Sequence, residues 1–308
     1  MTRAAPALLA APAFDRGRRA AIERLLAARG PAGHWTGRLS SSALSTATAL
    51  NALRLVDPAA HADRIAAGVA WLVATQNADG SWGDTVDSRG NLSTTLLCWS
   101  VLAALAETPS GGHPPGLGAA VARAADSIRA RTGSLDARAV AATLAGIYGR
   151  DRTFSVPILT HAILCGRFGD PRDAATWRVV PQLPFELAAL PPAWFRLVDM
   201  QVVSYALPAL IAICQVRHAH RPAWGVPRWV RARAAAPTLA RLAAIQPDNG
   251  GYLEATPLTS FVTMSLAGMG LSRHPVARRG EAFLVASQRP DGSWPIDTNL
   301  ATCAPRSR

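Results

Sequence analysis

Apolar residues recur along this chain of 308 residues with the spacing of amphipathic helices. One apolar stripe comprises Leu92, Leu96, Trp99 and Leu102, and a second comprises Leu258, Phe261, Val262 and Leu266. Each stripe repeats every three to four residues, which places its side chains on one helical face. Alanine and leucine dominate the composition, whereas long alternations of β-branched residues are rare. The pattern therefore predicts an all-α protein.

Three segments that follow predicted helices share the spacing Q-x-x-x-G-x-W/Y. They run from Gln76 through Gly80 to Trp82, from Gln246 through Gly250 to Tyr252, and from Gln288 through Gly292 to Trp294. The glycine allows a tight turn with positive φ, and the glutamine amide can satisfy open backbone groups at a helix end. A fourth segment, Gly33-His34-Trp35, keeps only the Gly-x-Trp end. The aromatic residues are therefore expected to seal the ends of repeated helical hairpins.

The motifs order the helices into two sets. Outer helices are expected over about 17–29, 60–76, 228–245 and 274–288, with further helical stretches near 118–130 and 136–148. Inner helices are expected near 39–54, 91–106, 154–168, 200–216 and 255–270, with a sixth beginning at Thr298. We therefore predict one six-hairpin α/α toroid (an α6/α6 barrel) over residues 17–308, after a flexible N-terminus over residues 1–16. The last inner helix is expected to be incomplete, because Pro305 and a basic tail follow it.

The charge is basic and unevenly placed. The net charge is +12, no lysine occurs, and no acidic residue lies between Met200 and Pro247. Arginines and two tryptophans alternate within residues 217–241, a combination that suits either an anionic membrane surface or a solvated outer helix. No nucleic-acid recognition motif accompanies the charge, and no apolar run is long enough to span a bilayer. We therefore expect a cytoplasmic protein with peripheral membrane contact and no nucleic-acid partner.

The repeated motifs resemble the QW motifs of the terpene cyclase/mutase family, and of the squalene-hopene cyclases in particular. The segments Pro184–Pro191, Trp194-Phe195 and Val203-Ser204-Tyr205 are similar to the proline-rich region of that family. The resemblance implies a toroid that takes an apolar polyisoprenoid and cyclises it by protonating an alkene, without metal or organic cofactor. Family members have two such barrels and about twice this length. A second barrel could therefore come from another chain.

The resemblance also implies site residues. Asp297 occupies the place of the proton-donating aspartate, although the companion carboxylates of the family's D-x-D-D motif are absent. Glu254 also lies at the start of an inner helix, where a helix cap is the alternative role. Asp84 and Asp87 are interpreted as turn formers. The side chains expected to line the cavity are Trp194, Phe195, Tyr205, Phe154 and Phe261.

Two other functions stay open at the level of the sequence. The same toroid could serve as a non-catalytic apolar cup that binds an isoprenoid or a partner protein. A sugar-active α/α toroid would need a pair of carboxylates flanking a polar groove, and the acidic residues here are too sparse to favour it. The four scattered cysteines are expected to be buried thiols.

Overall fold

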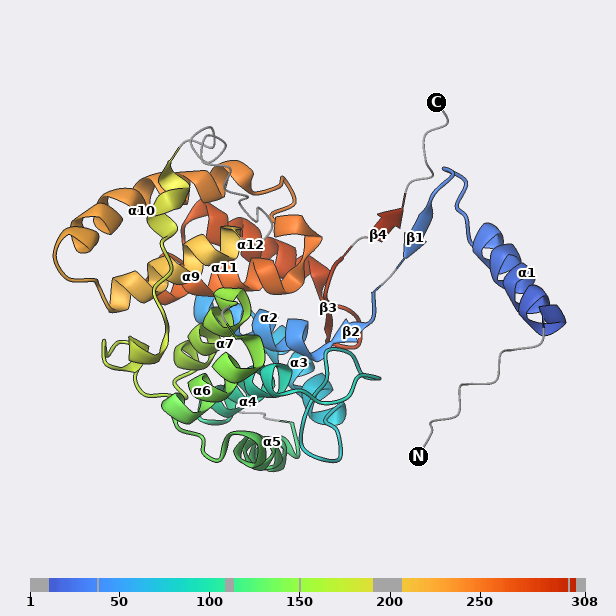
Figure 1. Ribbon diagram of the computed structural model, residues 1–308, viewed down its shortest axis with the longest axis horizontal. Helices are drawn as coiled ribbons and strands as arrows, with labels where there is room; N and C mark the ends of the chain where they lie inside the picture. The colour runs from blue at the N-terminus through green and yellow to red at the C-terminus, as the bar shows by residue number, and fades with distance from the viewer. Residues whose placement is uncertain are drawn as a thin grey trace. The chain divides into compact units, whose positions relative to one another are not determined.

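The computed structural model describes residues 11–37, 39–108, 114–149, 151–190, 207–298 and 300–302, and their regular structure is mostly α-helix with four short strands (Figure 1). Their contacts divide the chain into two units, one formed by Ser40–Thr298 and the other by Met1–Leu39 with Asn299–Arg308. The larger unit thus begins at Ser40, whereas the sequence pattern suggested a toroid beginning at residue 17. The all-α toroid itself is confirmed.

The larger unit is a ring of inner helices with shorter and longer helices outside it. The inner helices are α2 (Ala43–Val56), α4 (Leu92–Ala106), α7 (Arg152–Leu164), α9 (Leu207–His220) and α11 (Thr256–Gly268). The outer elements are α3 (Ala62–Ala74), α5 (Leu117–Thr132), α6 (Ala137–Tyr148), η1 (Thr176–Val179), η2 (Phe185–Ala189), α10 (Val226–Ile245) and α12 (Pro275–Ser287). The inner helices are buried on nearly all sides, so they lack a strong polar face.

The inner helices close on themselves within the described residues. Each one packs against the next in the order α2, α4, α7, α9 and α11, and α11 then packs against α2. Figure 1 shows these first and last helices of the ring side by side, in blue and red. Ser41 and Ser42 (β2) pair antiparallel with Trp294 and Pro295 (β3) at the same junction. The ring is therefore closed by elements from its two ends.

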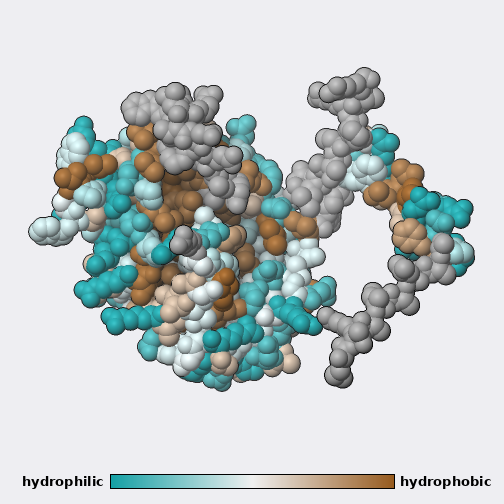
Figure 2. Space-filling view, in the orientation of Figure 1, coloured by the Kyte–Doolittle hydropathy of each residue, from teal (hydrophilic) through white to brown (hydrophobic). Residues whose placement is uncertain are grey.

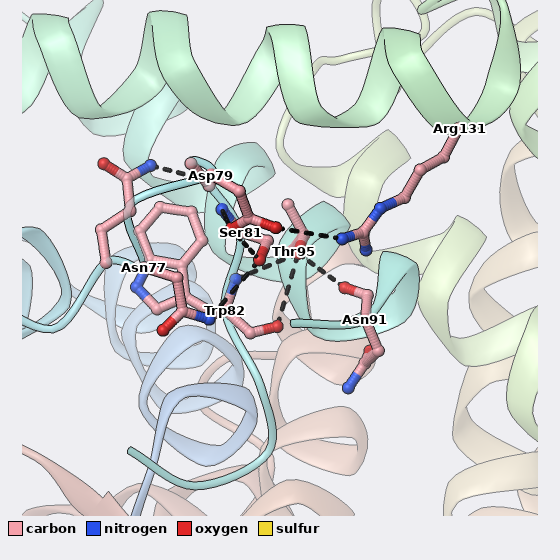
Figure 3. Close-up of polar contacts among 9 residues, drawn as sticks. Asn77, Asp79, Ser81, Trp82, Asn91, Thr95 and Arg131 are labelled. Atoms are coloured by element: carbon pink, nitrogen blue, oxygen red, sulfur yellow. Dashed lines mark hydrogen bonds and ion pairs between the residues drawn. The ribbon is translucent and has the colours of Figure 1, made fainter. Parts of the chain in front are cut away.

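The aromatic residue of each motif makes the same two hydrogen bonds. Its side chain donates to the carbonyl oxygen of a leucine ten residues earlier, at 3.0 Å from Trp82, 2.9 Å from Tyr252 and 2.7 Å from Trp294. Its backbone N–H donates to a threonine hydroxyl in the first turns of an inner helix, at distances of 3.0 to 3.1 Å. Figure 3 shows this second contact for Trp82 and Thr95. Each aromatic residue thus joins an outer helix to an inner helix.

The glutamine of each motif connects neighbouring outer helices. Its amide donates both to the motif glycine and to a carbonyl oxygen of the next outer helix, which is Ala120 for Gln76, Val276 for Gln246 and Arg64 for Gln288. The third motif therefore continues from α12 onto α3, at the beginning of the larger unit. The amide thus joins each motif to the first turn of the next outer helix, a contact that the sequence analysis did not predict.

The sixth inner helix expected at Thr298 is not present in the described residues. Leu300–Thr302 form a strand (β4), and the place after the third motif is occupied by α2. The N–H of Trp294 donates to Thr46 of α2, just as that of Trp82 donates to Thr95 of α4. The sequence pattern paired α2 with the helix before it, whereas in the structure α2 follows the third motif and completes the hairpin of α12. Five inner helices close the described ring.

The smaller unit holds a fourth version of the hairpin end. Helix α1 (Ala11–Ala27) is followed by β1 (Trp35–Gly37), which pairs antiparallel with β4. Trp35 donates its ring N–H to the carbonyl oxygen of Leu25, again ten residues earlier, and Arg29 donates to Gly33. The Gly-x-Trp turn therefore keeps its geometry with an arginine in place of the glutamine.

Polar groups cross-link the centre of the ring. The Asn51 side chain of α2 lies 3.2 Å from Nδ1 of His161 in α7, and Nε2 of His161 donates to the carbonyl oxygen of Leu97 in α4. Burial lowers the pKa of His161 to about 3, so this imidazole is neutral and structural. Three described cysteines, Cys98, Cys165 and Cys214, are buried free thiols, as expected.

Candidate functional site

A cavity of about 710 Å³ opens at the N-terminal ends of the inner helices. Every inner helix contributes to its wall, through Leu44 of α2, Leu97 of α4, Pro157 of α7, Leu210 of α9 and Phe261 of α11. Its volume lies within the range of small-molecule sites, and most of its wall is apolar. The ring therefore carries a binding cavity suited to an apolar ligand.

Aromatic rings form part of this wall. Phe154, which is 54% exposed, stacks on Tyr148 with ring centroids 5.4 Å apart. Phe261 belongs to α11, and its side chain is buried. Both phenylalanines were expected to line a cavity, and the structure places both in this wall. The expected residues Trp194, Phe195 and Tyr205 lie outside the described residues.

The structure brings Asp297 and Glu254, the two predicted catalytic residues, to one edge of the cavity. Asp297 forms a backbone bridge with Ala255, and the N–H of Thr298 donates to the carbonyl oxygen of Glu254 at 3.0 Å. Ala255 and Ile296, their immediate neighbours, line the cavity, whereas neither carboxyl group does. Their catalytic roles therefore stay predictions.

The two carboxyl groups differ in their surroundings. Partial burial raises the pKa of Asp297, which favours the protonated acid. The Glu254 carboxylate accepts hydrogen bonds from Asn249 at 2.5 Å and from Thr298 at 2.6 Å. Such bonds suit a carboxylate that holds two loops together. Asp297 is thus the better placed of the two to supply a proton.

Backbone strain marks the same edge. Leu253 and Glu254 have φ values of 54° and 57°, in the left-handed region that non-glycine residues seldom adopt. The Leu253 side chain is 60% exposed and lines the cavity. Strain of this kind gathers at functional sites, where surrounding contacts hold it. The strained turn therefore presents an apolar side chain at the cavity mouth.

Asp84 is a site residue that the sequence interpretation missed. It lines the cavity, and its Oδ1 accepts hydrogen bonds from Thr94 at 2.5 Å and from Asn91 at 2.9 Å. The sequence offered one signal, because Asp84 follows the motif aromatic residue Trp82 and precedes the N-cap Asn91 of an inner helix. The hydrogen bonds from Thr94 and Asn91 hold this carboxylate at the start of α4, where the cavity opens.

Comparisons of the sequence with known proteins give a matching family model and several similar proteins. The model of the squalene-hopene cyclase N-terminal domain matches residues 19–162. An enfumafungin synthase from Hormonema carpetanum is 29% identical over 67% of this chain, and a squalene hopane cyclase from Aspergillus fumigatus is 26% identical over 85%. A terpene cyclase–glycosyl transferase fusion protein from Humicola fuscoatra is 31% identical over 63%.

These relatives are much longer proteins. The matches cover 13%, 32% and 12% of their respective lengths, so the chain spans a third or less of each. The matched domain, the similar relatives and the α/α toroid all point to the same family. This chain is a member of the terpene cyclase family with squalene-hopene cyclase-like repeats.

Proposed function

We propose that the chain binds a polyisoprenoid in the cavity of the ring and cyclises it by protonating an alkene. The observation that carries this proposal is the apolar cavity, together with the raised pKa of Asp297, whose neighbour Ile296 lines that cavity. The names of the relatives support it, since one is a squalene hopane cyclase and another a terpene cyclase fusion. The reaction would be an isomerisation, because no atom is gained or lost.

The chemistry needs an acid, a dry cavity and stabilised cations. The Asp297 carboxylic acid would give its proton to one alkene carbon, and the π electrons would form the new C–H bond. The cation at the other carbon would then be attacked by the next double bond, which closes a ring. Aromatic faces such as those of Phe154 and Phe261 would attract the positive charge. Loss of a proton from the last cation restores an alkene and leaves the reaction balanced.

The Asp297→Asn variant tests the proposal. The amide keeps the shape of the carboxyl group but cannot act as the acid, so cyclic product should fall by about 10²-fold or more. Purified protein would be incubated with squalene and with shorter polyprenols, and products identified by mass spectrometry. The Asp63→Asn variant on the exposed face of α3 is the control, and it should retain full activity.

Two results would contradict the proposal. Unchanged product in Asp297→Asn would exclude this residue as the proton donor. Tight binding without any cyclic product in the wild-type protein would instead identify the ring as a non-catalytic isoprenoid cup.

We also propose that the beginning of α10 contacts an anionic membrane surface. Trp224 is 94% exposed and Trp229 is 64% exposed, and the guanidinium of Arg233 lies 5.2 Å from the Trp229 ring centroid. The connection between α9 and α10 lies on the left side of Figure 1. Figure 2, in the same orientation, shows apolar and hydrophilic residues together on that side. Aromatic side chains beside arginines suit the headgroup zone of a bilayer. None of the described helices is long and apolar enough to cross a membrane.

Vesicle binding tests this contact. Replacing both Trp224 and Trp229 with serine should lower the partitioning of the protein onto phosphatidylserine-containing vesicles by about tenfold or more, because two exposed apolar side chains are lost. Cosedimentation measures the bound fraction. The Val86→Ser variant removes an exposed apolar side chain elsewhere and should bind like the wild type. Equal binding of all three proteins would exclude the surface.

A further inference from the structure

The wall of the cavity carries a cluster of oxygen atoms beside the start of α4, whereas most of its other lining residues are apolar. Asp84 holds Thr94 and Asn91 at the N-terminal end of α4, and Oγ of Ser93 lies 2.6 Å from the hydroxyl of Tyr148. All five residues line the cavity. Apolar residues of α11 and Ile296 form another part of the wall. The cavity therefore has a polar end and an apolar body.

The polar end has an open acceptor. Both hydrogen bonds to the Asp84 carboxylate go to Oδ1, and no described residue donates to Oδ2. The Asp84 side chain lies beside the start of α4, where the helix dipole favours its negative charge. A neutral hydrogen-bond donor that enters the cavity, such as a hydroxyl group, can therefore form a charge-assisted hydrogen bond to Oδ2.

The same carboxylate disfavours anions. The end of α4 is already capped, because Asn91 accepts from the N–H of Thr94 at 2.8 Å, and Asp84 supplies the negative charge that the helix end attracts. A diphosphate group placed there would meet a like charge within a few ångströms. No described arginine or histidine lines the cavity to offset that repulsion.

We propose that the cavity selects a polyisoprenoid with a free hydroxyl group, held by Asp84 at the polar end. This inference rests on the proposed function, since it assumes that an isoprenoid enters the cavity. The hydroxyl would donate to Oδ2 of Asp84, and Tyr148 would donate to the hydroxyl oxygen. A hydrocarbon of equal length cannot donate to Oδ2 of Asp84, and a prenyl diphosphate is repelled.

Binding of three matched probes tests the inference. The probes are geranylgeraniol, the hydrocarbon in which hydrogen replaces its hydroxyl group, and geranylgeranyl diphosphate, each measured by equilibrium dialysis with the full chain. We expect the alcohol to bind about tenfold more tightly than the hydrocarbon, and the diphosphate to bind weakest. The Asp84→Asn variant should lose about tenfold in alcohol affinity and gain in diphosphate affinity, with hydrocarbon binding unchanged.

Two further variants keep the test specific. Tyr148→Phe keeps the stack on Phe154 but removes the hydroxyl, so only alcohol binding should weaken, by a few fold. Asp87→Asn removes an equal charge from the same loop but away from the cavity wall, and should leave all three affinities unchanged.

The outcomes separate this inference from the proposed function. Equal affinity for alcohol and hydrocarbon, or an unchanged ranking in Asp84→Asn, would overturn the selection by Asp84 while leaving isoprenoid binding intact. Failure of all three probes to bind would overturn the proposed function, and the selection with it.

Discussion

Replacing Trp294 with alanine is expected to lower the free energy of unfolding of the ring by about 3–5 kcal/mol, the usual cost of deleting a fully buried tryptophan. Trp294 is completely buried, and its ring N–H holds Leu284 of α12. It also lies where the third motif contacts α2, the first inner helix. The cavity that its loss leaves would therefore weaken the packing that closes the ring. Chemical denaturation followed by circular dichroism measures the change.

Trp224→Ala provides a matched control. It removes the same side chain from a position that is 94% exposed, so the free energy of unfolding should change by less than about 0.5 kcal/mol. Equal effects of the two substitutions would show that the third motif does not hold the ring closed.

Replacing Gly250 with alanine should destabilise the protein by about 3 kcal/mol. Gly250 has a φ of 85°, and a Cβ there would overlap the backbone carbonyl of Arg279 in α12. The left-handed backbone costs an L-residue roughly 1–2 kcal/mol, and overpacking typically adds about 1–3 kcal/mol. Because the obstacle is backbone, the neighbouring helix would have to move. The shift of the thermal unfolding midpoint measures the loss.

The control is Gly146→Ala within α6. Nothing lies within 4 Å of a Cβ at Gly146, and its φ is ordinary, so alanine should stabilise the helix by about 0.5–1 kcal/mol. A destabilisation of the same size at both glycines would mean that close packing is not why the motif needs glycine.

Helix positions could be predicted from the sequence because their apolar spacing and hydroxyl caps are local signals. The predicted range 91–106 is α4 (Leu92–Ala106), and 274–288 is α12 (Pro275–Ser287). The partner of the first inner helix could not be predicted in this way. Whether an inner helix belongs to the outer helix before it or to one far along the chain depends on long-range pairing, which leaves no mark in local sequence. The pairing of Ser42 with Trp294 decides it.

The site was predictable only where its side chains belong to a predicted inner helix. Phe154 and Phe261 are aromatic residues of the predicted inner helices 154–168 and 255–270, and both line the cavity as expected. Asp84 was missed because an aspartate in a turn has the same local pattern whether it only caps the turn or also faces a cavity. Its contacts with Thr94 and Asn91 arise from the way the loop after Trp82 folds back over α4.

Closure of the ring also has consequences for the order in which the chain can fold. Helix α2 packs against α11 and meets Trp294, partners that leave the ribosome some two hundred residues after it (Thr46 and Trp294 are separated by 248 positions). Contacts of such high sequence separation form slowly, because a long loop must close before they stabilise anything. During synthesis the side of α2 that will meet α11 has no partner, and its alanines and leucines are exposed to chaperones or to other chains. We therefore expect the nascent protein to be most prone to aggregation just before its third motif is complete.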